Sequence, residues 1–205
     1  MADFIIKKKL IMDKNEIVKL RLKENISIKE KILSDDKLIN QIIKVSEVII
    51  RCFKNENKLW LCGNGGSAAD AQHLAAEFTG RYYFDRPPLP AEAIQVNTSY
   101  ITAVANDYSY DEIFSRYIKA HGKKGDVLIG ITTSGKSSNV IKALQAAKEI
   151  GLETIGFTGN YVDMLLKYTD YIVSVPSSDT PRIQEAHITI GHLICEIVEK
   201  ELFLK

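Results

Sequence analysis

The residues best suited to chemistry lie in two segments with helical periodicity. In the first, NGGSAADAQHLAAEF, His73 and Glu77 stand four apart, so a helix places them on one face. An imidazole and a carboxylate at that step are half of a zinc site, or an acid/base pair. The same pair on an ordinary helix surface would be only an ion pair. We favour a functional role because the pair begins six residues after a glycine-rich loop.

The second segment is PRIQEAHITIGHLICEIVEKELF, a helix pattern that is apolar nearly all round. Glu185 and His192 are seven apart and lie almost on one stripe, whereas Gln184 and His192 are about 80° apart around the axis. Both arrangements are compatible with one ligand, so spacing leaves open which residue works with His192. For His187 we expect a structural hydrogen bond, because polar groups in a buried helix need partners.

Two loops follow apolar runs and lead into helical segments. In NGGS, the glycines would let a ligand approach the backbone, and Ser67 is expected to cap the next helix. In TTSGKSS, hydroxyls and backbone N–H groups gather at another helix start. Helix N-termini favour anions, so two such loops on one sheet indicate a phosphate ester. The residues concerned are Asn64, Gly65, Gly66 and Ser67 in the first loop, and Thr132, Ser134 and Ser137 in the second.

Residues 130–137, GITTSGKS, also satisfy the G-x-x-x-x-G-K-[ST] spacing of P-loop nucleotide triphosphatases. Such a protein needs a strand ending in Asp to hold Mg²⁺, and no strand-like run after Ser137 ends that way. Only two strands remain after the loop, although nucleotide-binding folds usually place it near the start of the domain. The P-loop interpretation therefore ranks third, and Lys136 would be a solvated side chain.

The elements that must position these residues change in character near Lys58. Residues 1–57 carry helical periodicity, and we expect them to form a helical extension packed on the domain. From there to residue 205, five apolar runs alternate with loops and helices, which predicts a mainly parallel sheet in a three-layer α/β/α sandwich. Ligands of such sheets bind at the carboxyl ends of the strands, where both loops lie. The predicted strands are KLWLCG, AEAIQV, DVLIGI, ETIGF and DYIVSV.

Composition excludes several function classes. The chain has 27 Lys and Arg against 26 Asp and Glu, so charge gives no argument for binding nucleic acid or an anionic membrane. No apolar stretch approaches the ~18 residues that span a bilayer. The opening MADFIIKKKLI has its lysines after the apolar run, the wrong order for a secretion signal. With three cysteines and no C-x-x-C pair, we expect a cytoplasmic protein.

Four segments together resemble the phosphoheptose isomerases, which are sugar-isomerase (SIS) domain enzymes. The likeness covers roughly residues 40–200 in order. It implies an aldose–ketose isomerase that converts sedoheptulose 7-phosphate to D-glycero-D-manno-heptose 7-phosphate through an enediol, the first step of ADP- or GDP-heptose precursor synthesis. It also implies a homotetramer with sites between subunits. The segments are GNGGSAADAQHLAAEFTGRYYFDRPPLPAEAI, VANDYSYDEIFSRYI, GDVLIGITTSGKSSNVIKAL and PRIQEAHITIGH.

The resemblance assigns roles to residues. Those implied to hold the phosphate are Ser67, Thr132, Ser134 and Ser137. Those implied to line the site are Asn64, Gly65, Gly66 and Thr133, with Asn106 and Asp107 facing the sugar. The implied zinc ligands are His73, Glu77, Gln184 and His192, which chooses Gln184 over Glu185. We expect Glu77 to act as the base at the sugar carbon and His192 to move the oxygen protons. In the family's phosphate loop, [ST]-x-S-G-x-S, Lys136 fills a free position.

A non-catalytic relative provides the second hypothesis. The tetrameric protein that binds the bacterial replication initiator resembles this chain in its loops but lacks the glutamate and the last histidine. Because Glu77 and His192 are both present here, we prefer the enzyme over the binding protein. The resemblance does not indicate which glycan the heptose would enter.

Overall fold

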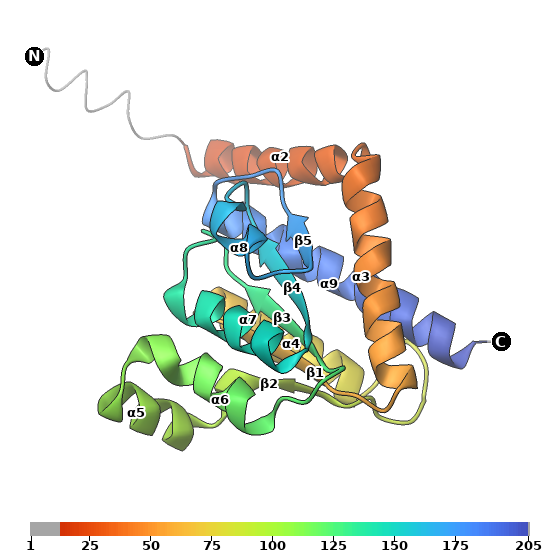
Figure 1. The fold of residues 1–205 in the computed structure, drawn as a ribbon. Coiled ribbons are helices and arrows are strands. Elements are labelled where there is room, and N and C mark those ends of the chain that lie inside the picture. The colour runs from red at the N-terminus through yellow and green to blue at the C-terminus, as the bar shows by residue number, and fades with distance from the viewer. Residues whose placement is uncertain (1–12, 205) are drawn as a thin grey trace, which may run out of the picture.

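A computed structural model describes residues 13–204, and a sheet of five parallel strands lies at its centre (Figure 1). The prediction of a parallel sheet is confirmed. The strand order is β2-β1-β3-β4-β5, so the winding direction reverses between β1 and β3. The strands are β1 (Leu59–Gly63), β2 (Ala91–Ala93), β3 (Val127–Ile131), β4 (Glu153–Thr158) and β5 (Tyr171–Ser174).

Helices cover both faces of the sheet, which confirms the predicted three-layer sandwich. One face carries α3, α4 and α9, and the other carries α6 and α7, with the short α8 beside them. The helices are α2 (Lys14–Leu33), α3 (Asp36–Lys54), α4 (Gly66–Thr79), α5 (Thr98–Asp107), α6 (Ile113–His121), α7 (Ser138–Ile150), α8 (Asp163–Leu166) and α9 (Thr180–Phe203), with 3₁₀ turns η1 (Ile94–Val96) and η2 (Tyr110–Glu112).

The buried strands explain why the sequence shows apolar runs instead of alternation. Side chains of β1 point to opposite faces in turn, so Leu59 and Leu61 join the core under α9, while Trp60 and Cys62 join the core under α7. Both faces are covered, so both sets must be apolar. This pattern also misleads at one place. The predicted strand AEAIQV pairs only over Ala91–Ala93, and the rest forms η1, whose Ile94 is fully buried. A short apolar run does not distinguish a strand from a packed turn.

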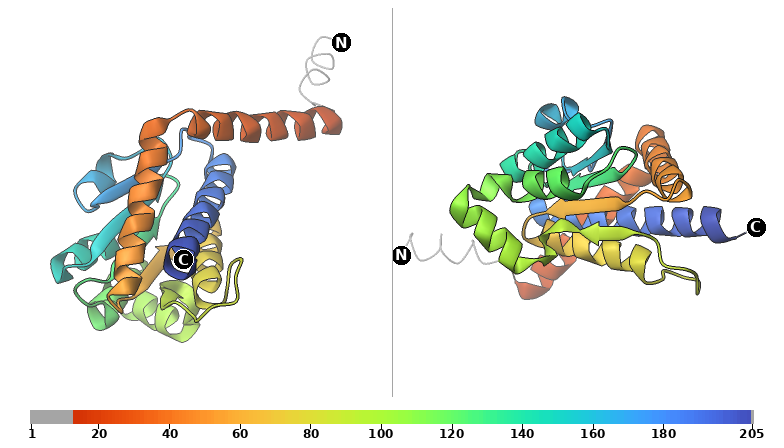
Figure 2. Two further views of the ribbon diagram at one scale, coloured as in Figure 1. Left: turned by 90° about the vertical axis from the view of Figure 1, so that its right-hand side faces the viewer. Right: turned by 60° about the horizontal axis from the view of Figure 1, so that its bottom comes forward.

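The N-terminal helices differ in how they are held. The side chain of Asp35 accepts bonds from the backbone N–H of Lys37 and Leu38 and so caps α3, which packs into the core beside α9. In contrast, α2 lies across the end of α9 and extends past the rest of the molecule (Figure 2). The division of the chain at residue 57 stays a prediction, and the opening MADFIIKKKLI lies outside the described residues. Within residues 13–204, no helix has the length and apolarity needed to cross a bilayer.

Candidate active site

The two predicted loops meet where the strand order reverses. They follow β1 and β3, which are paired in register from Leu59 with Val127 to Gly63 with Ile131. Because both strands end at the same edge, their loops and the helices they open, α4 and α7, lie next to one another. This is the crevice in which open parallel sheets bind ligands.

A pair of asparagines joins the two loops. Asn64 and Asn139 exchange reciprocal amide hydrogen bonds of 2.8 and 2.9 Å, and the Tyr110 hydroxyl donates to Asn64 Oδ1 at 3.0 Å. Asn139 is 3% exposed and lies at the start of α7. Neither Asn139 nor Tyr110 was predicted from the sequence. The pairing partner of a buried amide is not visible in a sequence, although Asn139 does directly follow TTSGKSS.

The first loop differs from the prediction in one respect. Helix α4 begins at Gly66, and its N-cap is Gly65 with φ +54° and no side-chain capping bond. Ser67 is therefore inside the first turn and buried, so the expectation that it caps the helix was wrong. A glycine suits the cap because φ is positive there. At Gly66 a Cβ would collide with the side-chain amide of Gln184, so this glycine lets α9 approach the loop.

The second loop keeps its hydroxyls close together. Thr132 is buried, and its Oγ1 lies 2.9 Å from Ser137 Oγ, while Ser134 Oγ accepts the Lys136 N–H at 3.2 Å. The Thr133 carbonyl accepts the N–H of Gly159. The ammonium of Lys136 lies 5.5 Å from the centre of the Tyr161 ring, a cation–π position on the surface. This arrangement favours the hydroxyls over Lys136 as the part of the loop that meets a ligand.

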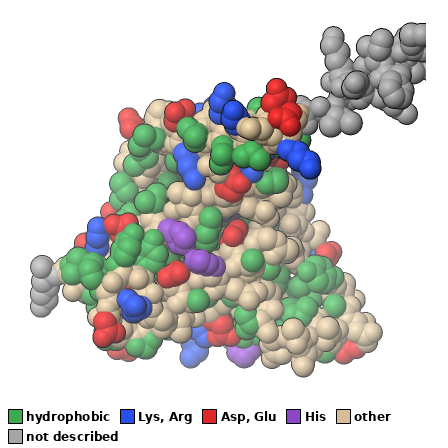
Figure 3. Space-filling model, turned by 180° about the vertical axis from the view of Figure 1, so that it is seen from behind, with side chains coloured by type: hydrophobic (Ala, Val, Ile, Leu, Met, Phe, Trp, Pro, Cys, Tyr) green, Lys and Arg blue, Asp and Glu red, His purple; other side chains and the backbone are tan. Residues whose placement is uncertain are grey.

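A cluster of two histidines and a glutamate lies between α4 and α9. His73 Nε2 is 2.9 Å from His192 Nε2 and 3.2 Å from Glu77 Oε1, and one donor atom from each residue lies within 4.8 Å of the others. Histidine side chains are in the open at the middle of the face shown in Figure 3. One ion could touch all three side chains, and two imidazoles with a carboxylate are donors that zinc accepts. The residues present therefore fit a zinc ion.

The helices α4 and α9 run side by side in the same direction and so bring this cluster together (Figure 2). Gly191 permits the close approach, because a Cβ there would lie 2.6 Å from Leu74 Cδ2. Gln184 faces α4 at Gly66, about 12 Å along α9 from His192. Its role as a fourth ligand stays a prediction.

The neighbouring Glu185 points the other way. Its carboxylate accepts hydrogen bonds of 2.5 Å from Arg182 and from Asn25 of α2. Burial alone would raise the pKa of Glu185, but the bonds from Arg182 and Asn25 hold it below its usual value. The two residues that spacing could not separate therefore face different helices, and only Gln184 faces the loops.

Asp70 is a further acidic residue beside the cluster that the sequence analysis missed. It lies one turn before His73 on α4, and its Oδ2 is buried with no hydrogen-bond partner among the described residues. Burial raises the pKa of Asp70 to about 6, although the nearby His73 opposes the shift. The i,i+3 spacing from His73 was available in the sequence as a signal.

Two predicted sugar-facing residues are not brought to the cluster in a single chain. Asn106 and Asp107 are exposed at the end of α5, where the Asn106 amide donates to Asp107 at 2.9 Å. No described contact joins them to the loops or to the histidines. Their role stays a prediction.

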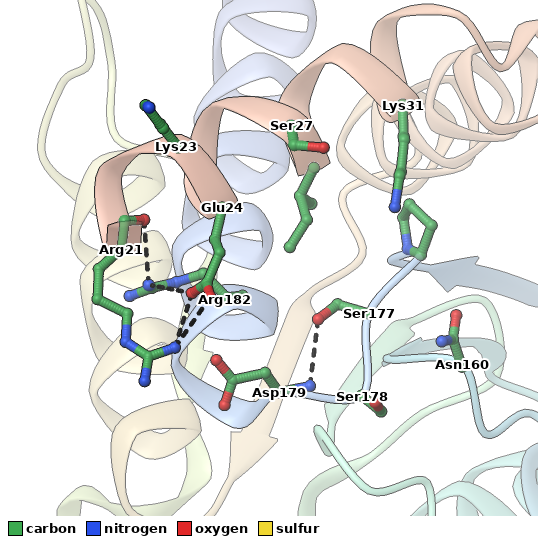
Figure 4. A pocket seen from close by; sticks show the side chains of 12 residues that line it. Arg21, Lys23, Glu24, Ser27, Lys31, Asn160, Ser177, Ser178, Asp179 and Arg182 are labelled. Carbon is green, nitrogen blue, oxygen red and sulfur yellow. Dashed lines mark hydrogen bonds and ion pairs between the residues drawn. The ribbon is translucent and has the colours of Figure 1, made fainter. Parts of the chain in front are cut away.

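A hollow of about 630 Å³ lies elsewhere, between α2 and the loop before α9 (Figure 4). None of the predicted site residues lines it. Its Arg182 is paired with Glu24 at 3.6 Å and with Glu185 at 2.5 Å, and Arg21 is paired with Glu24. These two arginines are neutralised by the protein itself, and the hollow lies where α2 meets α9.

The fold and the loops define a class of protein, since residues 24–159 match the SIS domain family, to which the chain belongs. Over 186 residues it is 54% identical to a phosphoheptose isomerase of Clostridium acetobutylicum, covering 91% of this chain and 95% of that one. The structure superimposes on phosphoheptose isomerases from Neisseria gonorrhoeae and Francisella tularensis with TM-scores of 0.86 and 0.88, at 39% and 31% identity, covering 92% of this chain and all of each of theirs. Within the SIS family, the chain is a member of the phosphoheptose isomerases.

Proposed function

We propose that this chain converts sedoheptulose 7-phosphate to D-glycero-D-manno-heptose 7-phosphate. The observation that carries the proposal is the position of the cluster. His73 and Glu77 lie on α4, the helix whose first turn forms one of the two phosphate loops. Phosphate binding and proton transfer are thus built on one rigid element. The sequence relatives named above are phosphoheptose isomerases, which supports this substrate over a nucleotide or a protein partner.

The size of the substrate suits this arrangement. His73 is six residues after Ser67, so the two are about 9 Å apart along the axis of α4. Seven bonds separate C2 of an open-chain heptose from the phosphorus, which spans about 8 Å when extended. A phosphate at the hydroxyls of Ser67, Thr132, Ser134 and Ser137 would therefore place the first two carbons near the cluster.

The reaction requires a proton to move between adjacent carbons. In the proposed sequence, the Glu77 carboxylate removes a proton from C1, leaving an enediol, and returns that proton to C2. His192 moves a proton from O1 to O2, so that the ketone becomes a hydroxyl and the first carbon becomes an aldehyde. The loops hold the phosphate still, so that C1 and C2 stay beside both groups.

The proposed metal is one zinc ion per subunit, held by His73, Glu77 and His192, with Gln184 as the fourth ligand. When bound, zinc supplies a Lewis acid that polarises the carbonyl oxygen. A carboxylate that ligates a metal is a weaker base, so the two roles of Glu77 oppose each other. Removal of the metal would show which of the two roles limits turnover.

We further propose that the working form is a cytoplasmic homotetramer with its sites between subunits. An apolar groove of about 530 Å³ runs between α2, α3 and α9, and Leu33 and Leu193 on its walls are 76% and 44% exposed. The projecting α2 exposes further large apolar side chains, which a second copy of the chain would cover. The free, buried cysteines suit a reducing compartment. The apolar side chains of α2 are Ile17, Val18, Leu20, Leu22 and Ile26.

The test is to incubate the purified chain with sedoheptulose 7-phosphate, with and without a zinc chelator, and to measure heptose phosphate. We expect product, and less of it with the chelator. If the chelator does not change the amount of product, the chain is an isomerase but zinc takes no part in the reaction. No product from a folded tetramer under either condition would reject the proposed function. Light scattering on the same sample checks the tetramer.

A further inference from the structure

Helices α4 and α9 are joined at three levels. Gly66 contacts Gln184 at the first level, and the histidines His73 and His192 meet at the second. At the third level, beyond the cluster, Arg86 forms an ion pair with Glu199 at 2.9 Å. We propose that Arg86 and Glu199 are positioning residues, which fix the distance between Glu77 on α4 and His192 on α9. The inference deepens the proposed function and rests on it for the catalytic roles of those two groups.

Arg86 lies in the irregular segment 80–90 but has its side chain inside the protein, where it is 2% exposed. Its guanidinium donates to the carbonyl oxygen of Glu77 and to that of Phe78, both at 2.8 Å, and to that of Gly80 at 3.3 Å. The last carbonyls of a helix have no partner within the helix, and a cation is favoured there. Arg86 therefore holds the end of α4 by the backbone of the proposed base itself.

Glu199 lies seven residues after His192, two turns along the same stripe of α9, and its side chain is 1% exposed. Besides Arg86, its carboxylate accepts the backbone N–H groups of Tyr82, Tyr83 and Phe84, at 2.7 to 3.2 Å. Burial would raise the pKa of Glu199, but these backbone bonds and Arg86 hold it below its usual value. The carboxylate thus stays charged inside the protein.

The pair connects the two catalytic groups by a short path. From Glu77 the path runs through its carbonyl to Arg86, then to Glu199, and along two turns of α9 to His192. The segment 80–90, which carries Arg86, also places the ring of Tyr82 against His192, with 5.8 Å between ring centres. A shift of the loop would therefore move both the end of α4 and a wall of the His192 site.

A role in stability alone does not explain this choice of residues. Well-packed apolar residues often stabilise a fold as well as a buried ion pair does, whereas a charged pair with many bonds specifies one geometry. Such fixed geometry is what a metal site or an acid/base pair needs, and loss of a supporting partner typically costs 10–100-fold in metal affinity or activity.

The variant that tests the proposal is Glu199→Gln, which keeps the volume and removes the charge. Asp126→Asn is the matched control, because Asp126 is also buried, at 3% exposure, and accepts two backbone N–H groups and the Trp60 indole N–H. It immediately precedes β3, at the opposite end of the strand from the phosphate loop. We expect both variants to lower Tm. Only Glu199→Gln should lower kcat per folded tetramer by about tenfold or more, with KM within about threefold of wild type.

A titration with Zn²⁺ alone gives a readout that does not depend on turnover. We expect Glu199→Gln to weaken Zn²⁺ affinity about tenfold or more, and Asp126→Asn to leave it unchanged. If Glu199→Gln does not fold, Arg86→Lys is the second variant. It keeps the positive charge but loses the guanidinium group that donates to the carbonyl oxygens of Glu77 and Phe78. Wild-type kcat and Zn²⁺ affinity in the folded variant, or equal losses in Asp126→Asn, would overturn the proposal. If the wild type is inactive, the proposed function is rejected instead. The Zn²⁺ titration would then decide whether Arg86 and Glu199 position the cluster.

Discussion

Helix α9 carries two histidines five residues apart, and it gives them opposite surroundings. His187 is 1% exposed, its Nε2 lies 3.1 Å from the carbonyl oxygen of Thr158, and its ring packs on Phe157. His192 lies on the face toward α4, where its Nε2 is 2.9 Å from His73 Nε2. One histidine has its partner at the end of a strand, whereas the other faces a group of ligand atoms at the surface.

The two histidines differ in where their partners come from. The partner of His187 is a backbone carbonyl of the sheet, whereas His192 lies among side chains that could bind a metal ion. His187 donates its single Nε2 proton to a carbonyl, while its Nδ1 is buried and has no hydrogen-bond partner within residues 13–204, so the ring is neutral. Burial lowers the pKa of His187 to about 4. The structural hydrogen bond that we expected for His187 is confirmed. The same distinction separates Glu185, bound to Arg182, from Gln184, which faces the loops.

The largest expected effect is a loss of kcat when a residue of the exposed cluster is replaced. His192→Ala and Glu77→Gln should each lower kcat by at least ~100-fold, because each removes a group proposed to transfer a proton. His187→Phe is the control on the same helix and should leave kcat within about threefold of wild type. Steady-state assays on tetramers of equal folded content measure all three. Near-normal turnover in either of the first two variants would remove that residue from the mechanism.

The second effect concerns the stability that His187 contributes. Its pKa is about 4 in the folded chain, below the usual 6.5, so between these pH values the unfolded chain binds more protons. Stability from this group is therefore fully present above pH 6.5 and is lost as the pH falls toward 4, by at most about 1.4 kcal/mol per pH unit. Thermal unfolding at pH 7 and pH 4.5 should show a smaller drop in Tm for His187→Phe than for wild type. Equal drops would mean that His187 does not titrate in this window.

The sequence predicted those features that depend on local pattern. Five apolar runs gave the parallel sheet, and small polar residues after two of them marked the crevice where β1 and β3 end. The i,i+4 step of His73 and Glu77 placed them on one face, and the structure brings His192 to that face. These features needed only the period of a helix and the rule that parallel strands end at one edge.

What the sequence did not predict depends on contacts between distant segments. Asn139 is paired with Asn64 across 75 residues, and Arg86 with Glu199 across 113. Neither pair has a periodic signature, because each is set by how separate elements pack. The wrong cap at Ser67 has a local cause instead. A serine after two glycines is a good cap by composition, but the cap lies two residues earlier, at Gly65, where φ is positive.

The smallest expected effect distinguishes the hydroxyls of the second loop from its lysine. Ser134→Ala should raise KM for the sugar phosphate and the Kd for inorganic phosphate about tenfold or more, because a hydrogen bond to a charged group contributes about 1.5–3 kcal/mol. Lys136→Ala should change both by less than about fivefold, because Lys136 is exposed beside Tyr161 and a solvated charge contributes at most about 1 kcal/mol. A larger effect from Lys136→Ala than from Ser134→Ala would return the lysine to the phosphate and favour the P-loop interpretation. The reverse order would assign phosphate binding to the hydroxyls of the loop, although the P-loop spacing singles out Lys136.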